Sequence, residues 1–261
     1  MISWLESLPT GTAGFVIVGG IVLAALAIGY LVGKVTPQNV RTAHNDRAGF
    51  ILAVIGVIYA VLLAFVAIGV WERFQEAETR TYEEAGALAT VYRDAGAFPA
   101  ATAHIRANIR AYVDSVIREE WPRMHRGDKP ELSNALLEDV ARDVRELPVG
   151  SARLSNIQSQ MLAAADVALM DRAARLTVDA SGINPIMWMV LIAGAIVTIA
   201  FTYLFGFDQT IMQQLMIGGL SFLIAIVLFV IVALDYPFRG SIAVAPEAFR
   251  ALGESLNAIS R

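Results

Sequence analysis

Four long stretches of this sequence contain no aspartate, glutamate, lysine or arginine, and they constrain the fold more than any other feature. They cover residues 14–33, 49–71, 186–205 and 211–234. The hydrocarbon core of a bilayer is about 30 Å thick, and a helix of roughly 20 residues crosses it with every backbone amide satisfied internally. Each stretch is long enough to do so. The sequence therefore predicts an all-α, four-span helical membrane protein.

The four stretches come in two pairs, separated by a segment of ordinary polar composition. Across the whole chain only 17% of the residues are charged, against about 25% in an average soluble domain. The predicted organisation is a first transmembrane hairpin, an all-helical soluble insert, a second transmembrane hairpin and a C-terminal tail. Their bounds are 1–71, 72–183, 184–236 and 237–261.

The connections between the spans predict which parts share a side of the membrane. Pro37 and Asn39 are turn formers between the first two spans, and only residues 206–210 separate the last two. Both pairs are then antiparallel, so the termini and the insert lie on one side. Basic residues near the insert favour a cytoplasmic insert in the cell (inner) membrane. They are Arg73, Arg80, Arg172, Arg175, Arg239 and Arg250. The short, basic first connection favours the opposite orientation.

Apolar periodicity predicts that the insert is helical throughout. Span two continues without a breaker to the region of Pro99. A second helix follows, and Pro122 together with residues 127–130 is expected to end it. A shorter amphipathic helix then reaches Pro148, and a last long helix covers about 151–180. The buried face of the second helix is predicted to contain Ile105, Ile109, Tyr112, Val113, Val116 and Ile117.

No pattern in the sequence predicts catalysis or a bound metal. The three histidines lie in different elements, and the chain has no cysteine. The adjacent carboxylates Glu83 and Glu84, like Glu119 and Glu120, point apart on a helix and make poor acid and base pairs. We expect no enzyme activity, no metal and no cofactor. A net charge of -4 without a basic tract gives no reason to expect nucleic acid binding.

Small residues form a stripe along the second span. They recur at spacings of three and four, which lets a neighbouring helix approach closely. We expect this stripe to serve helix packing. It comprises Ala53, Gly56, Ala60 and Ala64.

The opposite side of the second span carries large apolar residues and then acids at the same helical period. The apolar residues are Ile58, Leu62 and Phe65, and the acids are Glu72, Glu76 and Glu83. One interpretation is the pore-lining helix of an oligomer, with an apolar constriction followed by a mouth that favours cations. The alternative is a lipid-facing side with a solvated acidic end, in which Glu76 and Arg80 form an ordinary i,i+4 pair.

Several short strings of the sequence resemble one family. They are Glu84-Ala85, residues 92–95, Glu120-Trp121-Pro122 and residues 235–240. Together they look like the uncharacterised bestrophin-like membrane proteins of bacteria and plants, and the layout is similar over nearly the whole chain. A weaker likeness, in layout alone, is to flagellar-motor and transport stator subunits.

The bestrophin resemblance implies an architecture. Bestrophins are homopentameric ion channels in which the second span lines the pore and the helical insert forms a cytosolic vestibule. The resemblance would place Leu62, Phe65 and Glu72 near a central axis. The acids below this neck distinguish the sequence from anion-selective animal bestrophins, as does the lack of a recognisable bestrophin-type calcium clasp.

Two functional hypotheses from different classes follow. The first is a homo-oligomeric bestrophin-like ion channel, a pentamer by resemblance, whose partners are the lipid bilayer, copies of itself and inorganic ions. The second is a non-conducting membrane scaffold or sensor whose helical insert binds a partner protein. An integral-membrane enzyme is disfavoured because no span carries an ionisable residue at depth.

Overall fold

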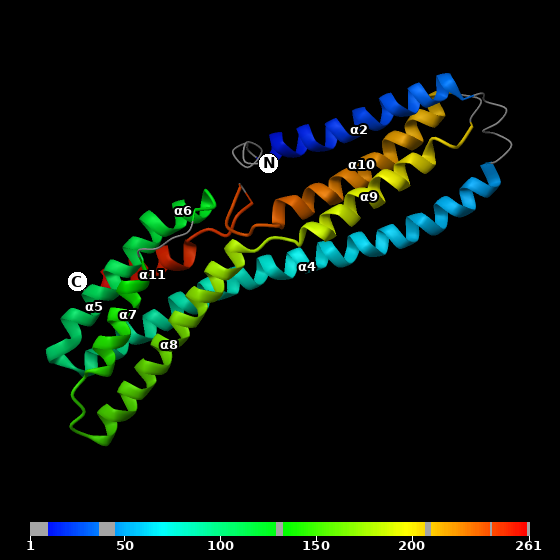
Figure 1. The fold of residues 1–261 in the computed structure, drawn as a ribbon. Coiled ribbons are helices and arrows are strands. Elements are labelled where there is room, and N and C mark those ends of the chain that lie inside the picture. Colours follow the sequence, from blue (N-terminus) through cyan, green and yellow to red (C-terminus); the bar gives the residue numbers. More distant parts are fainter. Residues whose placement is uncertain (1–9, 37–44, 129–132, 207–209, 241, 260–261) are drawn as a thin grey trace. The chain divides into compact units, whose positions relative to one another are not determined.

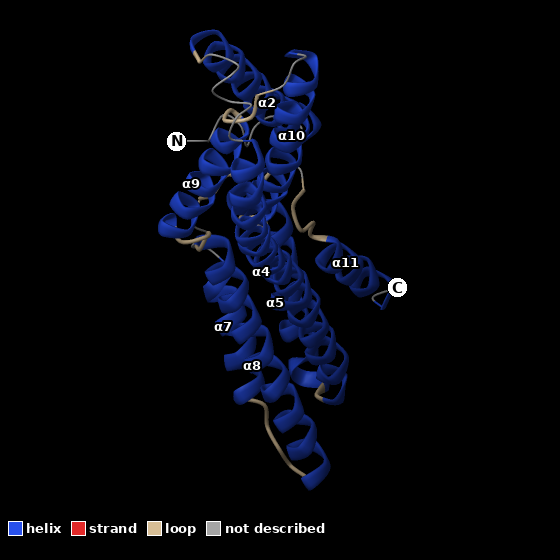
Figure 2. Cartoon of the chain, turned by 90° about the vertical axis from the view of Figure 1, so that its right-hand side faces the viewer, coloured by secondary structure: helices blue, strands red, loops and turns tan. Residues whose placement is uncertain are grey.

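The structure, a computed structural model, describes residues 10–36, 45–128, 133–206, 210–240 and 242–259. Every regular element in these ranges is a helix (Figures 1 and 2). Four of them, α2, α4, α9 and α10, are long and apolar enough to cross a membrane. The predicted fold class is therefore confirmed. The turn residues Pro37 and Asn39, and most of the link at 206–210, lie outside the described ranges.

The helix bounds follow the sequence pattern closely. The apolar helices are α2 (Thr10–Val35), α4 (Asn45–Asp94), α9 (Pro185–Thr202) and α10 (Thr210–Leu234). The others are η1 (Ala95–Ala97), α5 (Pro99–Ser115), η2 (Val116–Glu120), α6 (Trp121–His125), α7 (Ser133–Arg145), α8 (Ala152–Ala180) and α11 (Glu247–Ile259). Helix α4 runs without a break from the second apolar stretch deep into the insert, as the absence of a breaker predicts. The chain divides into two compact units, and α4 contributes its first part, up to Glu72, to one and its remainder to the other.

The first unit contains α2, the first part of α4, α9 and α10. Helix α2 packs along α10, and α9 also packs on α10. A β-carbon placed at Gly29 of α2 would lie 2.7 Å from Ile217 of α10, so any larger residue would force the Ile217 side chain to shift. Although the sequence pairs the first two spans as a hairpin, the main partner of α2 is the fourth span. Gly14 and Gly29 of α2 lie against Phe229 and Ile217 of α10, and such small residues allow two helices to approach closely.

Several polar contacts in the first unit lie at the ends of its helices. Asn45, at the start of α4, exchanges two hydrogen bonds with the backbone of Gly206, at 2.8 and 3.0 Å. At the opposite ends of α9 and α10, Asp235 accepts from the backbone N–H of Ile183 at 2.6 Å and from the indole of Trp188 at 3.3 Å. These bonds connect the α9 and α10 ends through groups that would otherwise be unpaired.

The second unit is a helical bundle with a continuous apolar core. The predicted face of the second insert helix is buried, apart from Ile117, which is half-buried. From α7 the core receives Leu137, Val140 and Val144. Helix α8 begins at its N-cap Ser151, whose hydroxyl accepts from the backbone N–H of Leu154 at 3.3 Å. Such a cap satisfies one of the free N–H groups of the first turn.

Residues 237–261 are expected from the sequence to form a tail. Instead, this segment supplies α11, which belongs to the second unit and packs on α5. Phe249 is fully buried, with its ring 5.8 Å from that of Trp121 and 6.4 Å from that of Tyr112. The amphipathic face of α11 therefore completes the core of the insert.

Pro122 is expected to help end the second insert helix, and this prediction is wrong. The helix continues through Pro122 to His125 because Val116–Glu120 form a π-helical turn. Trp121 donates its backbone N–H to the carbonyl of Val116, five residues back. A proline ring clashes with the carbonyl four residues earlier in an α-helix, and the wider turn accommodates that ring. The same turn directs Glu120 and Trp121 into the core, where both are buried.

Candidate functional site

The first part of α4 has a sector that packs within the chain. It contains the buried residues Tyr59, Leu63 and Val70. The Tyr59 hydroxyl donates to the carbonyl of Leu191 at 2.9 Å, and its ring occupies the space that a β-carbon of Gly194 would need. This sector therefore joins α4 to α9.

The predicted constriction lies on one flank of that sector. Ile58 is 66% exposed and Phe65 72% exposed, while Leu62 is half-buried. At 100° per residue, all three are turned away from the line through Tyr59 towards the same side. The structure therefore groups these three residues and leaves them largely uncovered by the rest of the described chain.

The predicted packing stripe lies on the other flank. Ala53, Ala60 and Ala64 are exposed, and Gly56 is half-buried. A β-carbon at Gly56 would meet no described atom within 4 Å. Among the described residues, then, no neighbouring helix packs closely on the stripe, and both flanks of α4 remain largely uncovered.

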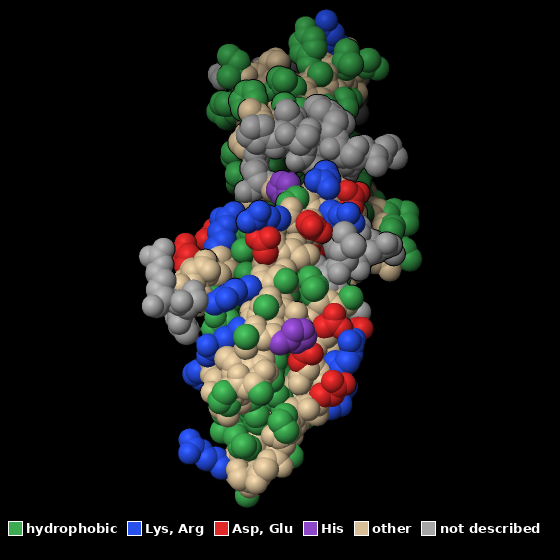
Figure 3. Space-filling model, turned by 90° about the vertical axis from the view of Figure 1, so that its left-hand side faces the viewer, with side chains coloured by type: hydrophobic (Ala, Val, Ile, Leu, Met, Phe, Trp, Pro, Cys, Tyr) green, Lys and Arg blue, Asp and Glu red, His purple; other side chains and the backbone are tan. Residues whose placement is uncertain are grey.

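The predicted acids continue the constriction side into the insert part of α4. Glu72, Glu76 and Glu83 are all exposed. The expected i,i+4 pair is present, with 3.5 Å between the guanidinium of Arg80 and the carboxylate of Glu76. Arg80 also lies 3.2 Å from Glu83 and 3.1 Å from Asp171 of α8. Figure 3 shows acidic and basic side chains intermixed on one face of the molecule.

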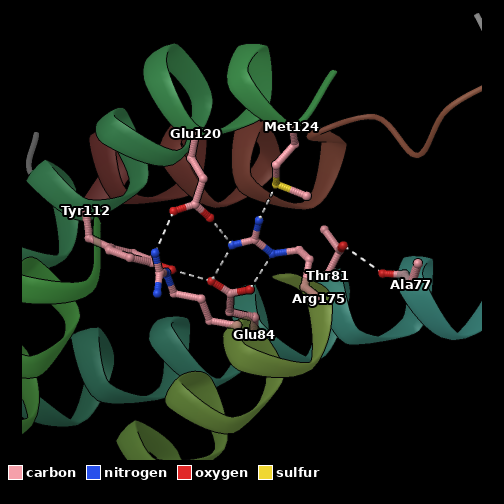
Figure 4. A network of polar contacts seen from close by, with 8 residues as sticks. Ala77, Thr81, Glu84, Tyr112, Glu120, Met124 and Arg175 are labelled. Carbon is pink, nitrogen blue, oxygen red and sulfur yellow. Dashed lines mark hydrogen bonds and ion pairs between the residues drawn. The ribbon is translucent and has the colours of Figure 1, made fainter. Parts of the chain in front are cut away.

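A buried charge network lies at the centre of the second unit (Figure 4). The guanidinium of Arg175 on α8 donates to both oxygens of Glu84 on α4, at 2.8 and 3.2 Å. It also donates to Glu120 of η2 at 2.5 Å, and Arg172 donates to the other oxygen of Glu120 at 2.9 Å. The Tyr112 hydroxyl of α5 donates to Glu84. The network thus joins helices that are distant in sequence.

Aromatic rings and a sulfur atom surround the guanidinium of Arg175. It lies 5.0 Å from the ring centroid of Trp121 and 5.7 Å from that of Phe249, and it contacts the sulfur of Met124 at 3.1 Å. The side chains of Arg175, Glu84 and Glu120 are fully buried. Buried charges are tolerated only when paired and hydrogen-bonded, as here.

The pKa values of the two carboxylates in this network are shifted in opposite directions. Burial raises the pKa of Glu84 above its ordinary value, although Arg175 opposes this effect. Burial also acts to raise the pKa of Glu120, but Arg175 and Arg172 together hold it below its ordinary value. The difference follows from the number of cations, since Glu120 has two guanidinium partners and Glu84 has one.

The structure offers no candidate metal centre in the part of the chain that it describes. No group of three or more histidine, cysteine, aspartate or glutamate side chains there could hold an ion. The network of Glu84, Glu120, Arg172 and Arg175 balances its own charges. Its geometry therefore serves to hold helices in place rather than to bind a cation.

Comparison with known proteins decides the family. The sequence matches the Bestrophin-like domain over residues 19–249. The chain belongs to the Bestrophin-like family.

The fold is similar to that of solved bacterial bestrophin homologues. A mutant of a bestrophin homologue from Klebsiella pneumoniae has a TM-score of 0.68 and 12% identity, covering 92% of this chain and 98% of that one. Another crystal structure of that homologue has a TM-score of 0.66 and 13% identity, with 91% and 98% covered. A search of the curated proteins found no match.

The motifs of this Bestrophin-like chain gain a physical role from the structure. Glu84, Glu120 and Trp121, which belong to the strings that carry the resemblance, meet around Arg175. In the string after the fourth span, the ring of Phe238 is 5.5 Å from that of Trp121. The strings are visible in the sequence, but their convergence in space is not. One signal was available, because Glu84 and Glu120 occupy inward positions in otherwise apolar helical periods.

The family match and the four apolar helices agree with one another. This Bestrophin-like chain is a membrane protein with a channel-type fold. Identities of 12 to 13% establish the fold alone.

Proposed function

We propose that this protein is a homo-oligomeric ion channel of the cell (inner) membrane, with α4 lining the conduction path and with a preference for cations. One observation supports the proposal above all. A single side of α4 carries Ile58, Leu62 and Phe65 and then Glu72, and the rest of the described chain leaves that side largely uncovered. Copies arranged around an axis would bring these residues into rings.

The proposed rings have distinct physical roles. Large apolar side chains in a narrow ring exclude water and with it ions, which gates a pore by dewetting. Carboxylates where the helix enters water raise the local concentration of cations and repel anions. Leu62 and Phe65 are therefore the proposed constriction, and Glu72, Glu76 and Glu83 the proposed mouth.

Ion flux through purified protein in liposomes tests the constriction. Leu62→Ala and Phe65→Ala should each increase ion leak, because a shorter side chain widens the dry ring. Leu215→Ala is the matched control, since Leu215 is equally apolar and 66% exposed on α10. It should leave the flux unchanged. If all three variants behave alike in an oligomer that conducts, α4 is not the pore helix.

Reversal potentials in a salt gradient test the mouth. Glu72→Gln combined with Glu76→Gln should shift the reversal potential towards anion preference, and the shift should shrink at high ionic strength because salt screens the charges. An unchanged reversal potential at low salt would contradict the proposed role of these acids.

The proposed assembly is a pentameric ring, by analogy with the family. The uncovered stripe of Ala53, Gly56, Ala60 and Ala64 is suited to close contact between neighbouring copies. Gly56→Leu or Ala60→Leu should then weaken assembly, as measured by native mass in mild detergent. A stable wild-type monomer would contradict the proposal, whereas an intact oligomer without flux would favour a membrane scaffold that binds a partner protein through its insert.

The proposed orientation places the insert and both termini in the cytoplasm. The arginines next to the insert support it through the positive-inside rule. Reporter fusions after Arg261 and at Asn39 should report opposite sides of the membrane, with Arg261 inside. A periplasmic C-terminus would reverse the assignment.

A further inference from the structure

Arg80 on α4 is shared among three carboxylates of the second unit. One terminal nitrogen lies 3.1 Å from Asp171 and 3.2 Å from Glu83, and the other lies 3.5 Å from Glu76. Glu76 and Glu83 belong to the proposed mouth, whereas Asp171 comes from α8. How the positive charge of Arg80 is divided therefore decides how much negative charge the mouth retains.

The three carboxylates differ strongly in burial. The side chain of Asp171 is 6% exposed, against 53% for Glu76 and 48% for Glu83. Its second oxygen, Oδ2, is buried and has no hydrogen-bond partner among the described residues. Asp171 is thus the carboxylate that most needs a counter-ion, because water cannot solvate it.

Burial also determines which of the three ion pairs is strongest. Exposed pairs on one helix are screened by water and contribute little. The contact with Asp171 lies in a region of lower effective dielectric, where the same separation gives a stronger attraction. The charge of Arg80 is therefore compensated chiefly by Asp171. Glu76 and Glu83 keep most of their negative charge towards the solution.

We propose that Asp171 is a specificity-determining residue of the pore mouth, which preserves the cation preference by binding Arg80. This inference rests on the proposed function, because it requires that Glu76 and Glu83 face the conduction path. Asp171 touches no ion itself. It acts by compensating the positive charge of Arg80, so that this charge does not neutralise Glu76 and Glu83.

Asp171→Asn tests this role directly. Asparagine has nearly the same shape and still offers Arg80 a carbonyl oxygen, but it carries no charge. Arg80 would then neutralise the mouth acids, and the cation-to-anion permeability ratio should fall roughly two- to threefold at low salt, as expected for one extra charge within several ångströms of the path. Asp114→Asn is the control, since it removes one carboxylate from an exposed ion pair between Asp114 of α5 and Arg118 of η2.

The double variant Asp171→Asn with Arg80→Gln separates a charge effect from a structural one. It restores the wild-type net charge of these four side chains, so the permeability ratio should return to the wild-type value. A double variant as weakly selective as Asp171→Asn alone would overturn the inference, because a merely disrupted helix contact cannot be repaired by removing its other half.

Glu72→Gln, measured in parallel, distinguishes this inference from the proposed function. If Glu72→Gln lowers the permeability ratio and Asp171→Asn does not, the mouth is correctly placed and the role of Asp171 is wrong. If neither changes the ratio in a conducting oligomer, the mouth itself is wrong and the inference falls with it. A fall in both, with restoration in the double variant, supports both.

Discussion

The helices within each of the two compact units are held together in different ways. In the first unit, helices approach one another closely where glycines leave room for large side chains. Gly14 lies against Phe229 and Gly29 against Ile217. In the second unit, helices converge on buried ions, with Arg175 between Glu84 and Glu120. Helix α4 takes part in both, through Tyr59 in one and Glu84 in the other.

The difference follows from what surrounds each unit. Lipid offers no hydrophobic drive for helices to associate, so shape and close contact must hold a bundle together there. The insert lies outside the apolar stretches. In water, burial of its Leu, Val and Phe side chains already drives folding. Its buried ion network adds directional contacts that join α4, α5, η2 and α8. Shape therefore dominates the first unit, and paired charge orders the second.

Removing the central cation should have the largest effect. Arg175→Met leaves Glu84 and Glu120 buried with fewer partners, and breaking a buried pair costs about 3–5 kcal/mol of the free energy of unfolding. We expect a large fall in the Tm of the insert, measured by circular dichroism in detergent. Arg142→Met is the control, because Arg142 pairs with Asp139 at an exposed site, and such pairs contribute about 0–1 kcal/mol. Equal losses in both variants would mean that the buried network does not order the insert.

The two buried acids should respond unequally to neutralisation. Glu120→Gln should destabilise the insert more than Glu84→Gln, because the fold lowers the pKa of Glu120 and raises that of Glu84. The Tm of each variant tests this ranking, and Glu119→Gln, at an exposed neighbouring site, serves as the control. Equal losses for Glu84→Gln and Glu120→Gln would contradict the opposite shifts.

The same shifts give the sign of the pH dependence. The charge on Glu120 contributes stability above its unfolded pKa, and this stability is lost as the pH falls through its lowered folded value. Protonation of Glu84 contributes stability below its unfolded pKa, which is lost as the pH rises through its raised folded value. The acid-induced loss of Tm should therefore be weaker in Glu120→Gln than in the wild type. In Glu84→Gln it should be stronger.

Filling a glycine contact in the first unit should have a smaller effect. Gly194→Ala puts a methyl group into the ring of Tyr59, and overpacking of this kind costs about 1–3 kcal/mol. Gly219→Ala is the control, because a β-carbon there meets no described atom within 4 Å. The melting temperature of the detergent-solubilised protein should fall only for Gly194→Ala. Alanine is the better helix former, so Gly219→Ala should not lower the melting temperature. An equal fall in both variants would mean that the loss in Gly194→Ala does not come from the contact with Tyr59.

The sequence by itself determined the helical class, the four spans, and the order and approximate positions of the insert helices. These properties are local, because the length of an apolar stretch and its 3.6-residue period are set by neighbouring residues and by the solvent. The same reasoning grouped Ile58, Leu62 and Phe65 on one side of α4, where the structure also has them. Proline was a less reliable guide, since the π-turn at Val116–Glu120 lets the helix continue through Pro122.

Only the tertiary structure decided which charges meet. Glu83 and Glu84 do point apart, as expected, but Glu84 turns inward to Arg175, 91 residues away in sequence. Likewise Arg80 finds Asp171 on α8, and α2 finds α10 rather than α4 as its main partner. These pairings join segments that are distant along the chain. No local pattern encodes them, because they depend on how several helices pack at once.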